Sequence, residues 1–499
     1  MIKKYFLVID ESTTRAKAFV FDRGFRIIAQ DSCEIKLFVD ENNYIEQDGN
    51  EIYSACIVAM KSALNNGGVL PEEIIGIGIT NQRGTSLAWD KTTGEPLGRA
   101  ISWQDTRASG IGKKIESDGW IKKIQERMIL PAGTLPLLNL FWLLNNNDLI
   151  NQKYQQGELM YGTIDSWLIY KLTEGRKYFT SYSNVSMFHG YDFVNMSWDE
   201  DYLRYLGISS AILPEVVHDV GLFGLTGKGI FGVEIPIMGA FADQQSATFA
   251  HRTIQAGMVK CTCGTGAFVD MCVGNHFKPA PVGMFPIAAY ITKNDCVFLV
   301  EGCIKTAGAI IEWLKDDIQL INDYNEIQTL AGSVPDSAGV YFIPALTGLG
   351  SPSWNSQISG SLTGLKRSTK KSHIIRALLE GVVFRIKEIC EIIQDQCATS
   401  IQLMRIDGGL SKSDVFCQLV ADSLGILVER SHLSEETALG VAELIALHFG
   451  YCSESELDAL INMSDKFYPR VEEITRMENL YNNWKKISNS QIQSEASTK

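Results

Sequence analysis

The first candidate functional segment follows an apolar run near the N-terminus. This run covers residues 5–9, the polar sequence DESTT follows it, and a second apolar run begins at residue 16. A carboxylate at the end of a strand can bind a hydrated Mg²⁺, and the hydroxyl and N–H groups of a tight turn can donate to phosphate oxygens. The spacing predicts a phosphate-binding hairpin, although a plain polar hairpin would look the same. Its candidate ligands are Asp10, Thr13, Thr14, Arg15 and Lys17.

A second turn of this kind lies near the middle of the chain. Two predicted strands at residues 258–263 and 267–273 are joined by Gly264, Thr265 and Gly266. Glycines let the backbone approach a ligand closely, and Thr265 adds a hydroxyl group. If the tips of the two hairpins face each other, they can hold a polyphosphate from both sides.

Small residues mark two further turns. The sequence DGG at residues 407–409 ends a predicted strand, and Ser413 lies where the next helix is expected to begin. Gly308 opens another predicted helix. Such turns allow a flat ligand to lie against the backbone, but they are also typical of simple strand-to-helix connections and of helix packing.

Side chains suited to a hydroxyl-bearing substrate follow three other predicted strands. Asp243 and Gln244 follow the run at 235–242, Arg83 follows the run at 74–79, and Trp103 follows the run at 100–102. A carboxylate can accept the proton of a substrate hydroxyl, while Arg and Trp can bind the hydroxyl and C–H groups of a polyol. Each residue has a structural alternative as a helix cap, a surface ion pair or a core aromatic.

The order of the predicted elements indicates an α/β protein with two similar domains. A meander of three strands is followed by a helix at 52–64 and a strand at 74–79, and a similar unit begins near residue 256. We therefore predict domains at residues 1–252 and 253–487. The polar residues 488–499 are expected to form a disordered tail.

Composition excludes several classes of protein. The chain has 499 residues and a net charge of −13, which argues against binding to nucleic acid or to a membrane surface. The first apolar run is too short for a secretory signal, and the 11 Cys residues are expected to be reduced thiols of a cytoplasmic protein. The histidines lack the spacing of an HExxH metal site.

Taken together, the motifs resemble the FGGY family of carbohydrate kinases, and most closely its glycerol kinases. The resemblance covers about residues 5–485, with the motifs in the family's order. They read VIDESTTRAKAFVFD, GIGITNQRGTSLAWDKTTGEP, AISWQDTRA, GTIDSWLIYKLT, ADQQSATF, CGTGAF, YFIPALTGLGSPSW, RALLEG, RIDGGLSKSD and ETALG.

The resemblance implies two actin-like, ribonuclease H-like domains with a nucleotide cleft, and transfer of a phosphoryl group from ATP with Mg²⁺. It also implies a homo-oligomer. Asp243 falls at the family's general base, with Gln244 beside it, and Asp10 would help to hold the metal. The positions implied for the nucleotide are Asp10, Thr13, Thr14, Arg15, Lys17, Thr265, Gly308, Glu312, Gly409 and Ser413. The positions implied for the acceptor are Arg83, Gly84, Trp103, Thr134, Asp243, Gln244 and Phe268.

Departures from the family pattern concern the acceptor most. Gly84 replaces a Glu that binds glycerol hydroxyls in glycerol kinases, and Thr134 replaces a pocket Tyr. Ser12 also replaces a turn glycine. These changes predict a larger, less charged pocket, which weakens the case for glycerol and favours a bigger polyol or ketose such as erythritol, threitol or xylulose. Glycerol and these larger acceptors therefore both stay open as substrates of a glycerol kinase-like enzyme. The remaining alternatives are a catalytically weak nucleotide-binding relative and, on the same superfold, a chaperone or cytoskeletal protein.

Overall fold

The first large sheet is built from the N-terminal half of the chain. The computed structural model describes residues 3–461 and 465–497. The sheet has six strands in the order β14-β15-β6-β1-β2-β3, with β1, β6 and β15 parallel. Its strands are β1 (Tyr5–Ser12), β2 (Arg15–Asp22), β3 (Ile27–Glu34), β6 (Ile74–Asn81), β14 (Val220–Leu225) and β15 (Pro236–Ala242).

The second large sheet is built from the C-terminal half. It has seven strands in the order β18-β19-β17-β16-β22-β23-β24. Strands β16, β22 and β23 are parallel, and β17, β19 and β18 extend the sheet as antiparallel neighbours in that order. Its strands are β16 (Met258–Cys263), β17 (Ala267–Gly274), β18 (Phe285–Ile291), β19 (Cys296–Ile304), β22 (Leu403–Asp407), β23 (Leu427–Arg430) and β24 (Asp465–Phe467).

The two sheets share one plan. In each, three neighbouring antiparallel strands are continued by two parallel strands that require helical crossovers; in the second sheet, β18 comes between β17 and β19 in the chain and lies at the edge. The order β3-β2-β1-β6-β15 in the first sheet corresponds to β19-β17-β16-β22-β23 in the second. The predicted α/β class and the predicted repeat of one unit are therefore confirmed. The chain passes from the first sheet to the second between Ala250 and Met258.

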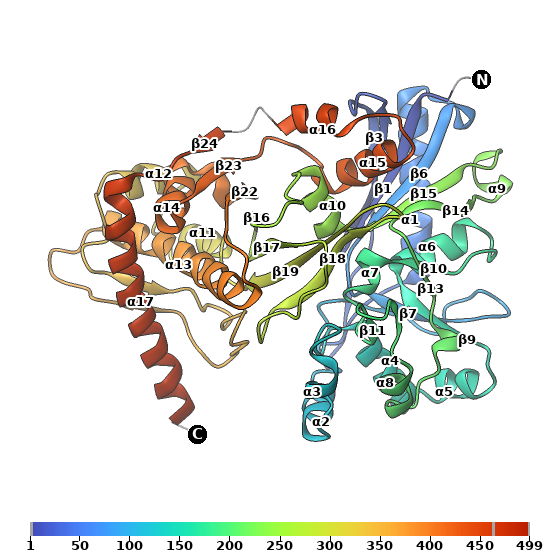
Figure 1. Cartoon of the computed structure of the whole chain (residues 1–499), viewed down its shortest axis with the longest axis horizontal. Coiled ribbons are helices and arrows are strands. Elements are labelled where there is room, and N and C mark those ends of the chain that lie inside the picture. Colours follow the sequence, from blue (N-terminus) through green and yellow to red (C-terminus); the bar gives the residue numbers. More distant parts are fainter. Residues whose placement is uncertain (1–2, 462–464, 498–499) are drawn as a thin grey trace.

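Two helices lie between the sheets (Figure 1). They are α10 (Asp243–Ala250), which follows β15, and α15 (Glu436–His448), which follows β23 along the chain. A Cβ on Gly440 of α15 would lie 1.9 Å from the carbonyl oxygen of Ser246 in α10, so only glycine permits this close helix crossing. Ile445 of α15 also packs in a buried cluster with residues of both sheets.

Smaller elements surround this frame. A five-stranded sheet in the N-terminal half has the order β4-β5-β8-β7-β9 and supports the segment that contains Trp103. Its strands are β4 (Phe38–Val39), β5 (Ile45–Gln47), β7 (Ser86–Asp90), β8 (Ala100–Ile101) and β9 (Leu159–Thr163). The longer helices around the sheets are α1 (Gly49–Gly67), α4 (Pro136–Asn146), α6 (Ile164–Leu172), α12 (Tyr324–Gly332), α13 (Lys371–Cys397), α14 (Asp414–Leu424) and α17 (Val471–Ser497).

The C-terminal segment corrects one expectation. Residues 488–499 were expected to be disordered, but helix α17 continues through Ser497 on the outside of the C-terminal half (Figure 1), and residues 498–499 lie outside the described residues. Ser361 Oγ donates to Gln491 Oε1 at 2.7 Å. This contact with the domain stabilises the helix, although the polar sequence of the segment has a low helix propensity. In the described ranges, none of the helices combines the length and apolar composition needed to cross a membrane.

Candidate active site

The first predicted phosphate turn is the tight hairpin between β1 and β2. Ser12 and Arg15 are paired across the hairpin, so Thr13 and Thr14 form its tip. Ser12 Oγ donates to the carbonyl oxygen of Arg15 at 2.9 Å, and this hydrogen bond closes the turn where the family pattern has glycine. Thr13 Oγ1 accepts a hydrogen bond from the indole of Trp103 at 2.9 Å, which joins the hairpin to the acceptor-side residues.

Asp10 lies near the end of β1, where the first sheet meets α15. Its side chain is nearly buried, and Asp10 Oδ2 accepts a hydrogen bond from Thr437 Oγ1 at 2.6 Å. Burial raises the pKa of Asp10 to about 6, an effect that the Thr437 hydrogen bond opposes and the nearby charge of Asp243 reinforces. The carboxylate is therefore charged at neutral pH but close to its titration range.

The two basic residues of this hairpin have acidic partners. Lys17 Nζ lies 2.8 Å from Glu435 Oε2, at the residue that precedes α15. Arg15 Nη2 lies 3.6 Å from Glu34 Oε1 on the neighbouring strand β3. Lys17 thus links the first hairpin to the C-terminal half of the chain, while Arg15 is paired along the outer strand. The predicted contacts of both residues with a nucleotide stay predictions.

The second predicted phosphate turn is packed against the start of α11 (Ala309–Glu312). The carbonyl oxygen of Thr265 accepts hydrogen bonds from the N–H groups of Ala307 and Ala309, both at 3.0 Å. A Cβ on Gly308 would lie 2.4 Å from the carbonyl oxygen of Gly264, so this position requires glycine. The predicted turn residues 264–266 and Gly308 therefore form one compact backbone unit.

A hollow of about 610 Å³ opens beside this unit, at the carboxyl ends of β22 and β23. Ligands of α/β proteins commonly bind at this edge of a sheet. Within the described residues, a Cβ on Gly409 would meet no atom within 4 Å, so this part of the wall is open. The residues that line the hollow include Asp407, Gly409, Lys412, Arg430 and Glu436.

Two other predicted nucleotide residues lie near the same region. The Ser413 side chain accepts a hydrogen bond from the N–H of Phe416 at 3.3 Å and so caps helix α14. Glu312 is the exposed last residue of α11. The structure gives Ser413 a role as a helix cap, and contact of either residue with a nucleotide stays a prediction.

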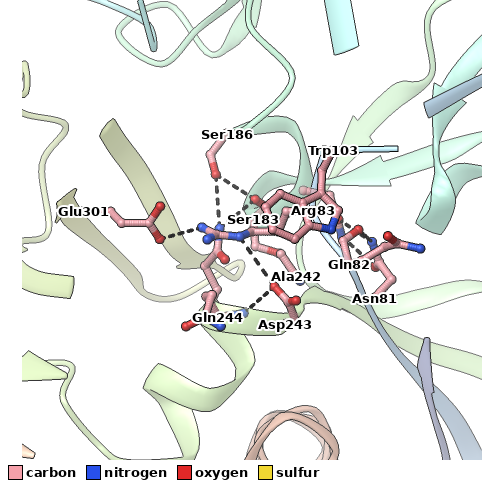
Figure 2. Close-up of polar contacts among 12 residues, drawn as sticks. Asn81, Gln82, Arg83, Trp103, Ser183, Ser186, Ala242, Asp243, Gln244 and Glu301 are labelled. Carbon is pink, nitrogen blue, oxygen red and sulfur yellow. Dashed lines mark hydrogen bonds and ion pairs between the residues drawn. The ribbon is translucent and has the colours of Figure 1, made fainter. Parts of the chain in front are cut away.

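Arg83 lies at the centre of the predicted acceptor site (Figure 2). Its Nε atom is 3.5 Å from Asp243 Oδ1, and its Nη1 atom is 2.8 Å from Glu301 Oε2 on β19. The guanidinium carbon also lies 6.0 Å from the centre of the Phe268 ring on β17. Arg83 therefore joins a residue of the N-terminal half, Asp243, to residues of the second sheet.

Asp243 is the first residue of α10, as expected for an acid at the end of a strand. Its side chain is 29% exposed, so a small ligand can reach it. Asp243 Oδ1 accepts a hydrogen bond from the N–H of Gln244 at 2.7 Å. Burial raises the pKa of Asp243 and the Arg83 charge opposes this shift, which gives a carboxylate that is more basic than usual. The Gln244 side chain accepts a hydrogen bond from Lys260 at 3.0 Å.

The residues that depart from the family pattern form one wall of this site. Gly84 has a φ of 77°, and a Cβ built there would lie 3.4 Å from Cβ of Trp103 and 3.6 Å from the carbonyl oxygen of Thr134. Trp103 is 39% exposed. The structure brings Gly84, Trp103 and Thr134 together, and none of the three carries a charge; their contact with an acceptor stays a prediction.

A buried polar network positions the loop that contains Arg83. The side-chain amide of Gln82 donates to Glu11 Oε1 at 2.7 Å and to Gln47 Oε1 at 3.0 Å. Thr85 Oγ1 donates to Gln82 Oε1 at 2.9 Å and accepts from the N–H of Trp103 at 3.1 Å. These hydrogen bonds hold Arg83 and Trp103 in fixed relative positions, although the second carboxylate oxygen of Glu11, Oε2, is buried without a hydrogen-bond partner among the described residues.

Several residues of the site were not predicted from the sequence. Lys260, Asp270 and Glu301 are buried charged residues in the middle of β16, β17 and β19. Glu435 and Thr437 contact the first hairpin from the start of α15. The sequence contains a signal for Lys260, Asp270 and Glu301, because each is a charged residue within an otherwise apolar run, such as the Glu in VFLVEGC.

The arrangement can separate two chemical tasks. The hairpins, Asp10 and the hollow beside β22 supply donors and an acid for a phosphate-bearing ligand, while Arg83, Trp103 and Asp243 supply groups for a hydroxyl-bearing one. In the part of the chain that the structure describes, no cluster of three or more His, Cys, Asp or Glu is placed to bind a metal. A metal bound by one carboxylate and by phosphate oxygens matches the coordination that Mg²⁺ prefers.

Comparison with known proteins shows which protein family the chain belongs to. Residues 5–250 match the N-terminal domain, and residues 259–448 the C-terminal domain, of the FGGY family of carbohydrate kinases. The chain belongs to this family, and the predicted family, fold and enzyme class are confirmed.

Individual relatives of the chain are glycerol kinases, and the similarity extends over nearly the whole chain. The chain is 36% identical over 488 residues to glycerol kinase 2 of Thermotoga maritima, with 97% of each chain covered. It is 37% identical over 489 residues to the glycerol kinase of Thermoanaerobacter sp. strain X514, again with 97% of each covered. The crystal structure of Plasmodium falciparum glycerol kinase with ADP matches with a TM-score of 0.92 at 29% identity, covering 98% of this chain and 99% of that one.

Proposed function

We propose that this protein phosphorylates a polyol hydroxyl with ATP, and that Asp243 is the general base. The observation that best supports the proposal is the position of Asp243, which is reachable by a ligand and lies beside Arg83 and close to Asp10. The full-length similarity to glycerol kinases, one of them solved with ADP, supports the nucleotide and the polyol. We also infer a cytoplasmic location, where ATP is supplied, and a homo-oligomer stays a prediction.

The residues divide the reaction between them. Arg83 and Trp103 bind and orient the acceptor, and Asp243 accepts the proton of its hydroxyl as the oxygen forms a bond to the γ-phosphorus and ADP leaves. The elevated pKa of Asp243 makes it a stronger proton acceptor than an exposed carboxylate. Asp10 would hold Mg²⁺ together with the phosphates, and the metal would supply charge neutralisation. Thr13, Thr14, Lys17, Thr265, Gly308 and Gly409 are proposed to contact the nucleotide.

The acceptor is proposed to be glycerol or a somewhat larger polyol or ketose. Gly84 and Thr134 leave the wall near Trp103 with small side chains, and this observation favours the larger acceptors. We expect turnover with glycerol, erythritol, threitol or xylulose, and ADP release in a coupled assay would measure it. A reaction without acceptor gives the basal ATP hydrolysis. If none of the four raises ADP release above that basal rate, the chain is a weakly active nucleotide-binding relative and the proposed function is wrong.

Affinity for ATP is expected to fall at acidic pH. Since the pKa of Asp10 is about 6, its carboxylate is charged above that pH and becomes neutral below it. The KM for ATP with Mg²⁺ is therefore expected to rise about tenfold between pH 7.5 and pH 5, because one unit below the pKa about a tenth of the carboxylates remain charged. Thr437→Val removes the hydrogen bond that lowers this pKa, so its transition is expected at a higher pH. A KM that is constant from pH 5 to 7.5 would contradict the assignment.

A further inference from the structure

A row of charged side chains crosses the second sheet below the acceptor site. Lys260 on β16 is directly opposite Asp270 on β17, and Asp270 is directly opposite Glu301 on β19. All three side chains are at most 1% exposed, and Lys260 Nζ lies 3.7 Å from Asp270 Oδ2. Charged residues are rarely buried to this extent unless they are paired.

The row continues into the N-terminal half of the chain at both ends. Glu301 pairs with Arg83, which lies beside Asp243, and Lys260 donates to the side chain of Gln244. Gln244 in turn donates its N–H to Asp243. The contacts therefore form a closed circuit across the two halves, which we call the charge ring. Its members are Arg83, Asp243, Gln244, Lys260, Asp270 and Glu301.

The ring contains two acids on neighbouring strands, and Glu301 is the one that contacts Arg83. Two like charges directly opposite each other on neighbouring strands repel, and burial strengthens the repulsion. Burial and the charge of Glu301 raise the pKa of Asp270. Glu301 is the acid of the two that contacts Arg83, because its Oε2 atom lies 2.8 Å from Arg83 Nη1.

The position of Glu301 affects Asp243 through Arg83. One end of the guanidinium is held 2.8 Å from Glu301, and its Nε atom remains 3.5 Å from Asp243. Without the Glu301 charge, the guanidinium would be free to form a two-pronged pair with Asp243, which is the geometry that Arg and carboxylates prefer. Such a pair would cover the carboxylate that the acceptor hydroxyl must reach.

We propose that Glu301 is a positioning residue for acceptor binding, which it achieves by holding Arg83 away from Asp243. This inference rests on the proposed function, because it assumes that an acceptor binds at Arg83 and Asp243. It also ties the acceptor site to the contact between the two halves of the chain, since Arg83 lies in the loop that follows β6 of the first sheet and Glu301 lies on β19 of the second.

The test compares Glu301→Gln with two other variants. Glu301→Gln is expected to raise the KM for the acceptor about tenfold, the effect of losing one charge-assisted contact, with the KM for ATP within about twofold of the parent. Glu301→Asp keeps the charge and is expected to recover part of the loss. The matched control is Glu380→Gln, another buried Glu that pairs with Arg376 at 2.8 Å on α13. It is expected to change thermal stability but neither KM. An acceptor KM within twofold of the parent in Glu301→Gln would overturn the proposal.

A second measurement separates this inference from the proposed function. If the parent protein phosphorylates none of the polyols, the proposed function fails, but the role of Glu301 can still be tested by hydrogen exchange. The peptide covering residues 79–86 is expected to exchange faster in Glu301→Gln than in both the parent and Glu380→Gln, because Arg83 loses its fixed partner. Equal exchange in all three proteins would overturn the proposal.

Discussion

Asp243→Asn is expected to lower kcat by about a thousandfold, within the range of general acid–base contributions. Asn has nearly the same shape as Asp but cannot accept the proton of an acceptor hydroxyl. The N–H of Gln244 can still donate to the Asn oxygen, and Arg83 keeps its Glu301 partner, so the site should stay in place. The KM for ATP is expected to change less than twofold. Steady-state ADP release measures kcat, and calorimetric titration with ATP checks that the nucleotide site is intact.

A buried acid elsewhere in the chain provides the control for this variant. Asp422 on α14 is fully buried and accepts a hydrogen bond from the N–H of Arg470 at 2.8 Å. Asp422→Asn removes a buried carboxylate without touching the acceptor site, and we expect its kcat to stay within about twofold of the parent. If Asp243→Asn retains more than a tenth of the parent kcat, Asp243 is not the general base.

The parts of the structure that could be predicted from the sequence are those with local signals. Alternating apolar runs and turn residues indicated both strand meanders, and Asp243, Arg83 and Trp103 each follow an apolar run that ends in the structure as a strand. These signals arise within about ten residues of chain, so one sequence contains them. The motif order then predicted the family, because ten short motifs in register are far more specific than any one of them.

The contacts between distant segments could not be predicted in this way. The pair between Lys17 and Glu435 joins residues 418 positions apart, and Arg83 and Glu301 meet only because two sheets face each other. Their partners depend on packing of the whole molecule. The tail was mispredicted for the same reason, since its polar composition hides the contact of Gln491 with Ser361. The partner of Arg15 could not be predicted from the sequence either, because Glu34 lies on an adjacent strand whose register is set by the hairpin.

Arg83→Gln is expected to lower both activity and stability strongly. It leaves Asp243 and Glu301 without the cation that lies between them, and removing one partner of a buried ion pair typically costs about 3 kcal/mol or more of folding free energy. We expect kcat/KM for the acceptor to fall about a hundredfold or more, since Arg83 also binds the acceptor. Urea denaturation measures the free energy of unfolding, and coupled ADP release measures kcat/KM.

Two further variants identify the cause of these losses. Arg83→Lys keeps the charge but not the fork of N–H groups, so it cannot contact Asp243 and Glu301 together; stability should largely return while kcat/KM stays low. In the double variant Arg83→Gln with Glu301→Gln, one of the two uncompensated carboxylates is gone, so the double variant should be more stable than Arg83→Gln although its kcat/KM stays low. If Arg83→Gln unfolds at the same urea concentration as the parent, the ion pairs of Arg83 do not contribute to folding. If the double variant is less stable than Arg83→Gln, the loss comes from packing of the Arg83 side chain and not from an unpaired charge.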